Sequence, residues 1–106
     1  MAKYLIKGNY TAEGGKGLAK DGGTGRRAAV QKALEALGGH LEQMYYAFGD
    51  VDVYVFIDAP DNVTAAALSL AVNSSGAVAL QTIPLLTCEE MDAAAHKSVN
   101  YRAPGR

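Results

Sequence analysis

The order of strand-like and helix-like stretches limits the folds open to this chain more than any other feature of its sequence. Stretches rich in β-branched and aromatic residues are typical of strands, and they span residues 3–10, 40–48, 51–58 and 77–86. Stretches with apolar residues at helical spacing are typical of helices, and they span residues 26–37 and 61–73. This order predicts two β-α-β units joined by a hairpin.

Glycine and capping residues indicate where the helices end and begin. Gly38 and Gly39 end the first helix, because glycine adopts the left-handed cap conformation without a Cβ penalty. Thr87 and Glu90 have the spacing of a capping box, which is typical of a helix start. We therefore predict a third helix from this cap to about Ser98, followed by an extended tail.

Together these elements predict an α+β ferredoxin-like fold, βαββαβ with a C-terminal helix, in which helices cover one face of an antiparallel four-stranded sheet. The 106 residues are enough to bury a core, and we predict one domain over residues 1–106. Pro84 cannot donate a ladder hydrogen bond, so we expect the last strand to lie at a sheet edge or to be bulged near its end.

The hairpin predicts which side chains share each face of the sheet. If Gly49 and Asp50 form a two-residue type II′ turn, the numbers of paired residues sum to 99. The helix-covered face then holds the side chains of Met44, Tyr46, Phe48, Val51, Val53, Val55 and Ile57. The opposite face holds those of Leu41, Gln43, Tyr45, Ala47, Asp52, Tyr54 and Phe56. A turn one residue longer would exchange the faces of one strand.

That second face is too apolar for open water and too polar for a sealed core, and no helix remains to cover it. A second copy of the chain is the simplest cover, because a twofold contact requires only self-complementarity. We therefore expect a homodimer or a higher even oligomer.

Short motifs spread along the chain resemble a known family, the GYD domain family. They are Leu37–Gly39 at a helix end, Phe48–Asp52 after an aromatic strand, Ala59–Asn62 before an alanine-rich helix, and the tail Tyr101–Gly105. The resemblance covers nearly the whole chain, and it implies a dimeric α/β barrel. The family has no established activity, so the resemblance implies nothing about a reaction.

The residues that name the family are only partly present. Its glycine and aspartate match Gly49 and Asp52, whereas its tyrosine falls on Val51. Whatever that tyrosine does in other members therefore cannot be carried over to this chain.

The resemblance also implies a place for a ligand. Dimeric α/β barrels enclose a cavity between sheet and helices, or between paired sheets, and some bind haem or oxidise aromatic substrates there. Depending on the faces, the residues lining such a pocket here would be Lys7, Asn9, Tyr45, Asp52 and Tyr54. The alternative is an ordinary interface whose tyrosines form hydrogen bonds at its rim. We expect a small-ligand-binding or interaction module. The alternative is a cofactor-free or haem-dependent oxygenase or isomerase, for which Asp52 is the one nearby carboxylate.

A glycine-rich segment, residues 14–25, precedes the first predicted helix. Its Lys16 and Lys20 and the following Arg26 and Arg27 form a candidate anion site, because backbone N–H groups at a helix N-terminus bind anions. The segment lacks the spacing of a Walker A or dinucleotide-binding loop. A flexible, solvated loop is the alternative.

Several classes of function are disfavoured by the sequence. His40 and His96 have no second ligand at metal-site spacing, so we predict no metal site, and nothing indicates a cofactor. Cys88, the single cysteine, is expected to be a small buried or half-buried residue. The net charge of −1 argues against nucleic acid as a partner. The longest apolar run, residues 64–72, is too short to span a membrane, and with no signal-peptide pattern we expect a cytoplasmic protein.

Overall fold

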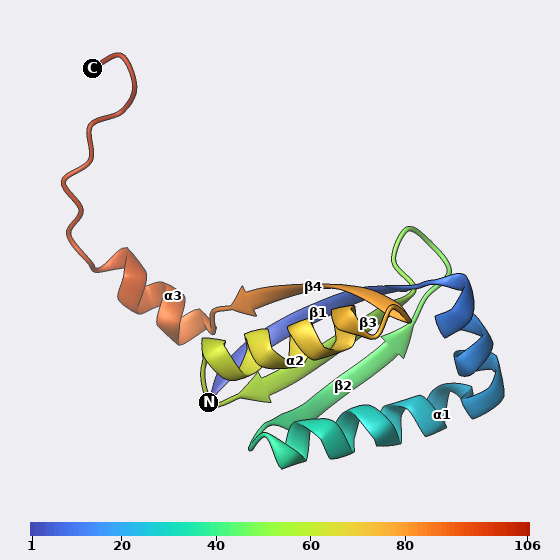
Figure 1. Ribbon diagram of the computed structural model, residues 1–106. Helices are drawn as coiled ribbons and strands as arrows, with labels where there is room; N and C mark the ends of the chain where they lie inside the picture. The colour runs from blue at the N-terminus through green and yellow to red at the C-terminus, as the bar shows by residue number, and fades with distance from the viewer.

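Four strands and three helices make up the chain, and the computed structural model describes residues 1–106. In chain order they are β1 (Ala2–Tyr10), α1 (Ala12–Ala36), β2 (His40–Tyr46), β3 (Val53–Ala59), α2 (Asn62–Ser74), β4 (Val78–Leu85) and α3 (Cys88–Ala95) (Figure 1). The predicted α+β order of elements is confirmed.

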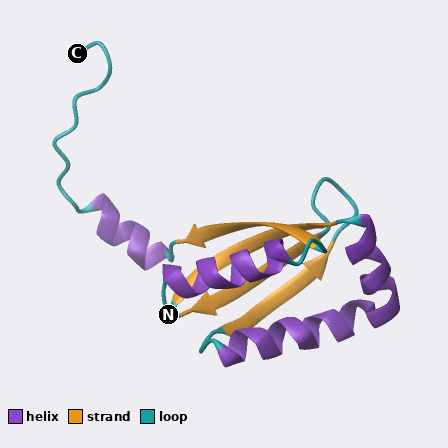
Figure 2. Ribbon diagram, in the orientation of Figure 1, coloured by secondary structure: helices purple, strands orange, loops and turns teal.

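The strands form one antiparallel sheet in the order β2-β3-β1-β4, with α1 and α2 over one face (Figure 2). The strand β4 lies at an edge of the sheet, as we predicted from Pro84. Pro84 is opposite Tyr4 of β1. The strands β1 and β2 both run antiparallel to β3, so they are parallel to each other and end at the same end of the sheet.

The core lies between the helices and the two central strands. Alternate residues of β3 from Val53 to Ala59 are buried, as period-two side-chain alternation requires. The core is completed by Tyr4 and Ile6 of β1, Leu34 of α1, and Ala65 and Leu68 of α2. Each large apolar side chain buried here contributes about 1.5–3 kcal/mol relative to exposure.

The other side of the sheet, here called the open face, is turned away from α1 and α2. Strand register places Leu5 between Phe56 and Ile83, and Lys7 opposite Tyr54. All of these side chains except that of Ile83 are half-buried, and Ile83 is exposed.

The connection between β2 and β3 is longer than predicted. It runs over residues 47–52, and Gly49 does not have the positive φ of a type II′ turn. The predicted register nevertheless holds over most of the hairpin, with Tyr45 opposite Tyr54. The loop opens because Asp52 is held by β1: its N–H donates to the Gly8 carbonyl at 3.0 Å.

Side chains predicted on the helix-covered face are therefore displaced by this loop. Phe48 and Val51 lie in the loop rather than under the helices, and Phe48 is fully exposed. A second displacement occurs at the other end of β2, where a bulge between Leu41 and Gln43 shifts the register. Leu41 therefore lies opposite Ile57 and packs against the core, so its predicted place on the open face was wrong.

Helix α1 begins at Ala12, so the prediction of a helix confined to residues 26–37 with a loop before it was wrong. Tertiary contacts override the low helix propensity of glycine here. Thr11 caps the helix by accepting the Gly14 N–H, and its hydroxyl bonds the Gly76 carbonyl at 2.9 Å. A Cβ on Gly14 would lie 1.8 Å from the Ala77 carbonyl oxygen, so only glycine permits this approach.

A kink at Gly22 divides α1 into two segments. Gly22 has φ 74° and ψ 166°, a conformation that side chains rarely adopt. The first segment, here called the arm, runs from Ala12 to Asp21 and bends around the end of the sheet (Figure 1).

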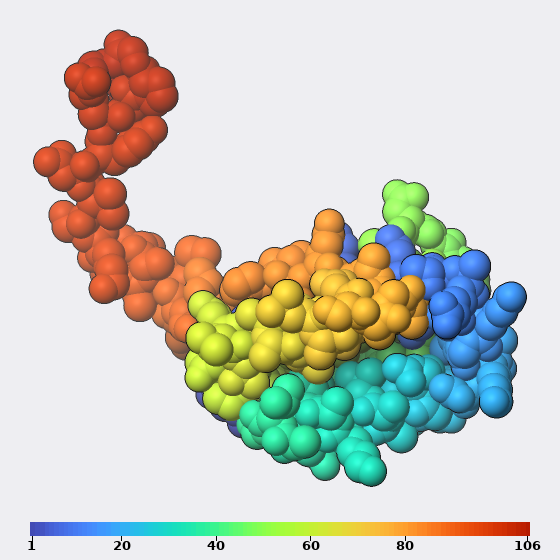
Figure 3. Space-filling model, viewed as in Figure 1, coloured from blue at the N-terminus to red at the C-terminus, as the bar shows by residue number.

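The capping box of α3 is present as predicted, although the helix ends at Ala95 rather than near Ser98. Helix α3 and the tail project away from the rest of the chain (Figure 3). Because this helix packs against no core, Cys88 is exposed rather than buried or half-buried as expected. None of the helices combines the length and apolar character needed to cross a bilayer.

Candidate functional site

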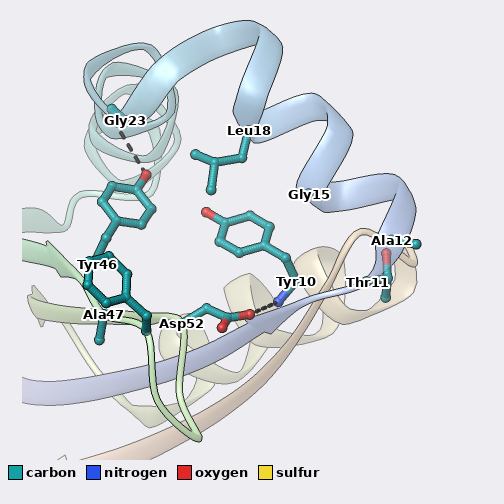
Figure 4. Close-up of a pocket in the computed structure, with 10 residues that line it drawn as sticks. Tyr10, Thr11, Ala12, Gly15, Leu18, Gly23, Tyr46, Ala47 and Asp52 are labelled. Atoms are coloured by element: carbon teal, nitrogen blue, oxygen red, sulfur yellow. Dashed lines mark hydrogen bonds between the residues drawn. The ribbon is translucent and has the colours of Figure 1, made fainter.

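Two cavities lie on the helix-covered side of the sheet, and Tyr10 lines both of them. The outer pocket has a volume of about 550 Å³ and lies between the arm, the end of β1 and the loop 47–52 (Figure 4). The inner cleft has a volume of about 140 Å³ and lies between the sheet and the helices α1 and α2. The two cavities are neighbours with a shared wall.

The topology brings the side chains of the outer pocket together. Tyr10 ends β1 and Tyr46 ends β2, and these parallel strands finish at the same end of the sheet. The arm contributes Leu18 to the lining of the same pocket. Figure 4 shows the side chains of Tyr10 and Leu18 pointing into the space beside the ring of Tyr46, whose hydroxyl points to Gly23.

The kink in α1 positions the Tyr46 phenol. After Gly22 the helix axis changes direction, and the Gly23 carbonyl accepts a hydrogen bond from the Tyr46 hydroxyl at 3.4 Å (Figure 4). Burial and, to a smaller extent, the Tyr10 hydroxyl raise the pKa of Tyr46 to about 12, against the opposing charges of Arg26 and Arg27. The phenol is therefore neutral at physiological pH and acts as a hydrogen-bond donor.

Asp52 is the one acidic residue that lines either cavity. Its carboxylate accepts the Tyr10 N–H at 2.9 Å, and its own N–H donates to Asn9 Oδ1 at 3.0 Å. The carboxylate thus fixes the backbone at the mouth of the outer pocket.

Apolar side chains form almost the whole of the inner cleft, since twelve of its thirteen lining residues are hydrophobic. The sheet contributes Ile6 and Val55, and α2 contributes Leu68. Facing them on α1 are Ala29 and Ala33, whose small side chains leave the space open. A cavity of about 150 Å³ accommodates a benzene-sized molecule, so this cleft, which is open to solvent at the exposed Ala29 and Ala33, is large enough for one ring.

Arg26 is the exception in the lining of the inner cleft. Its nearest acidic partner is Asp21, with 3.8 Å between Arg26 Nη1 and Asp21 Oδ2, which is longer than a hydrogen bond. Arg26 is thus a charged group at an apolar cavity with donors available for a further partner.

The predicted pocket residues are divided between the two sides of the sheet. Lys7, Asn9, Tyr45 and Tyr54 lie on the open face and line neither cavity. Only Asp52 lines the outer pocket. The structure therefore brings Lys7, Tyr54 and Tyr45 together as neighbours across three strands, but away from the cavities.

The predicted anion-site residues are also divided. Lys16 and Lys20 are exposed on the arm and line neither cavity. Arg26 lines the inner cleft, whereas Arg27 lines a shallow groove beside β2.

Tyr10 is the candidate site residue that sequence reasoning missed. Its signal lies in the topology, because an aromatic residue at the end of each of two parallel strands places both rings at one sheet edge. Tyr46 was expected on the helix-covered side, and its hydroxyl does reach α1.

The chain was compared with family models, curated proteins and solved structures. The model of the GYD domain matches residues 4–95. No curated protein matches the chain, and no solved structure does. Because the matched residues run from β1 to the end of α3, this chain belongs to the GYD domain family.

Proposed function

We propose that this protein binds a small ligand without turnover, and that it acts as a homodimer formed through the open face. The observation that carries the ligand proposal is the position of Tyr10, whose side chain lines both cavities. An apolar cleft beside a pocket with polar groups suits a ligand with an apolar body and one polar end.

The groups around the cavities favour binding over catalysis. A general base would have to be Asp52, and its carboxylate is already bonded to the Tyr10 N–H. The Tyr46 pKa of about 12 keeps its phenol protonated, so it can orient a ligand but is a poor proton acceptor near neutral pH. These groups position a ligand rather than react with it.

The homodimer is supported by the composition of the open face. Register aligns Ile83, Leu5 and Phe56 as a row across three strands, beside a second row of Lys7, Tyr54 and Tyr45. A twofold contact would bury the apolar row while the polar ends of the second row reach the rim.

The ligand proposal can be tested with toluene, a neutral probe of the size the inner cleft accepts. Titration followed by amide chemical shifts should move the signals of residues lining the cleft, such as Val55 and Leu68. Ala33→Leu fills the cleft from α1 and should abolish these shifts. Because the new side chain occupies the space of the ring, the loss should be complete at probe concentrations that saturate the wild type.

Ala28→Leu is the matched control, since Ala28 is exposed on the same helix and does not line the cleft. It should bind toluene as the wild type does. Two results would rule out the inner cleft as the binding site. One is that toluene causes no chemical-shift changes in the wild type, and the other is that it causes equal changes in Ala33→Leu and Ala28→Leu.

A further inference from the structure

We propose that the ligand is a compact apolar acid, one ring or its aliphatic equivalent with a single carboxylate, and that Arg26 binds the carboxylate. This inference rests on the proposed ligand-binding function and gives it a chemical class. Three features of the inner cleft support it: its size, its lining and its one charge.

Size limits the apolar part of the ligand. The cleft holds about 140 Å³, close to the volume of about 150 Å³ that accepts benzene in a dry cavity. A second fused ring would exceed this volume. The cleft therefore selects a body of one ring.

Charge determines the other end of the ligand. Arg26 is the only charged residue in the lining, and no carboxylate shares the cleft with it. An apolar cavity lined by one guanidinium, whose nearest carboxylate is Asp21 at 3.8 Å outside the lining, favours an anion that brings its apolar body with it. Carboxylate is the best geometric match, because the planar guanidinium binds both of its oxygens through parallel hydrogen bonds.

The hydroxyls of Tyr10 and Tyr46 also suit the carboxylate end of the ligand. Tyr10 lines both cavities, and Tyr46 lies close enough to Arg26 for its charge to act on the phenol. A carboxylate at Arg26 would therefore face the polar side of the site, with the ring directed into the cleft. Asp52 lines only the outer pocket, so its negative charge does not share the cleft.

Arg26 could instead serve only to cover the cleft, with its aliphatic stem over the apolar surface and its head in water. Its partial exposure and the distant Asp21 fit either role. The two roles differ in one measurable respect. A covering stem does not distinguish a charged ligand from a neutral one of the same shape, whereas a binding guanidinium does.

The test is calorimetric titration of the full chain with phenylacetate and with phenylacetamide, which have the same shape and differ in charge. The wild type should bind phenylacetate roughly tenfold more tightly, since hydrogen bonds to a charged group are stronger than neutral ones. Arg26→Gln should remove this preference by weakening phenylacetate binding, while phenylacetamide binding changes by less than about twofold. Naphthylacetate should not bind to either protein.

Arg27→Gln is the control, because Arg27 carries the same charge on the next residue but does not line the inner cleft. It should keep the wild-type preference for phenylacetate. Equal losses in the two variants would mean a general effect of positive charge, and this would overturn the assignment of Arg26. The wild-type preference needs no variant, so it tests the ligand class even if Arg26→Gln misfolds.

Toluene separates failure of this inference from failure of the proposed function. If toluene binds in the cleft but the two phenylacetyl probes bind equally, the ligand site stands and the acid is excluded. If none of the three binds, both proposals fall together.

Discussion

Tyr46 connects three parts of the site through one side chain. Its backbone belongs to β2, its hydroxyl donates to the Gly23 carbonyl beyond the kink, and its ring lines the outer pocket. Partial burial makes ionisation of the phenol unfavourable, which raises its pKa from 10.0 to about 12. The partial burial of this side chain therefore links the stability of the fold to pH.

The link has a definite sign. Because the folded-state pKa is raised, the native state keeps the phenolic proton at a pH where the unfolded chain has lost it. The stabilisation is fully present below pH 10.0 and is lost as the pH rises toward about 12. We predict that urea unfolding shows this loss in the wild type, and that Tyr46→Phe reduces the steepness of the decline.

Tyr101→Phe is a suitable control, since Tyr101 is exposed in the tail and should leave the pH profile unchanged. Both variants remove one tyrosine, so other groups that titrate in this range contribute equally. If the two profiles coincide, the Tyr46 phenol is not coupled to folding.

At the scale of elements, α1 shows how tertiary contact can hold a weak helix in place. The arm contains Gly14, Gly15 and Gly17, and each glycine in a helix interior costs about 1 kcal/mol relative to alanine. The cap at Thr11 and the close approach of Gly14 to Ala77 offset this cost at the start of the arm. At its other end, Gly22 supplies the backbone conformation that turns the chain.

Two alanine substitutions in the same helix should therefore have opposite effects. Gly17 is helical and a Cβ there meets nothing within 4 Å, so Gly17→Ala should stabilise the fold by about 0.5–1 kcal/mol. Gly22 has φ 74°, so Gly22→Ala should destabilise it by about 1–3 kcal/mol. Free energies of unfolding in urea provide the measurement. Stabilisation by both would mean that the kink is dispensable and that α1 can continue straight through residue 22.

Sequence patterns predicted the elements with strong local signals, and missed those that depend on distant contacts. The apolar spacing of the second half of α1 and the Thr87 cap each identify a helix from neighbouring residues alone. The arm could not be predicted in this way, because its start depends on Ala77, more than sixty residues further along the chain. Local propensity counts the glycines as breakers, while the close approach that requires one of them is visible only in three dimensions.

The hairpin shows the same division within one element. Its register followed from counting across the turn, and Tyr45 does lie opposite Tyr54. The same counting did not predict which faces the residues at the ends of the hairpin occupy, because Asp52 pairs with β1 and a bulge displaces Leu41. This error had its largest effect on the predicted pocket. Asp52 was grouped with Tyr45 and Tyr54, whereas the loop turns it to the helix-covered side, beside Tyr10.

At the scale of the whole molecule, the helices and the tail leave one sheet face without cover. The two helices α1 and α2 occupy the other face, and α3 with the tail extends away from both (Figures 1 and 3). The radius of gyration is 16.8 Å, whereas a compact chain of this length has about 13 Å. Because the extended tail inflates the apparent size, mass must be measured by sedimentation equilibrium rather than inferred from elution volume.

Sedimentation at micromolar concentration should give twice the chain mass of 11.1 kDa, and substitutions on the two faces should separate association from folding. Tyr54 lies on the open face of a central strand, between Lys7 and Tyr45. Tyr54→Ala should weaken the dimer by about 2 kcal/mol, or roughly thirtyfold in the dissociation constant, because aromatic groups near the centre of an interface carry much of its energy. Its unfolding midpoint should depend more steeply on protein concentration.

Val55, the next residue, is the matched control because its side chain points into the core and is 5% exposed. Val55→Ala removes buried methyl groups and should cost about 1–3 kcal/mol of folding free energy, with the same shift of the midpoint at low and high protein concentration. Adjacent residues of one strand would thus report on two different interactions. A wild-type chain that sediments as a monomer at high concentration would contradict the homodimer, and the apolar row of Ile83, Leu5 and Phe56 would then be exposed to solvent in the functional protein.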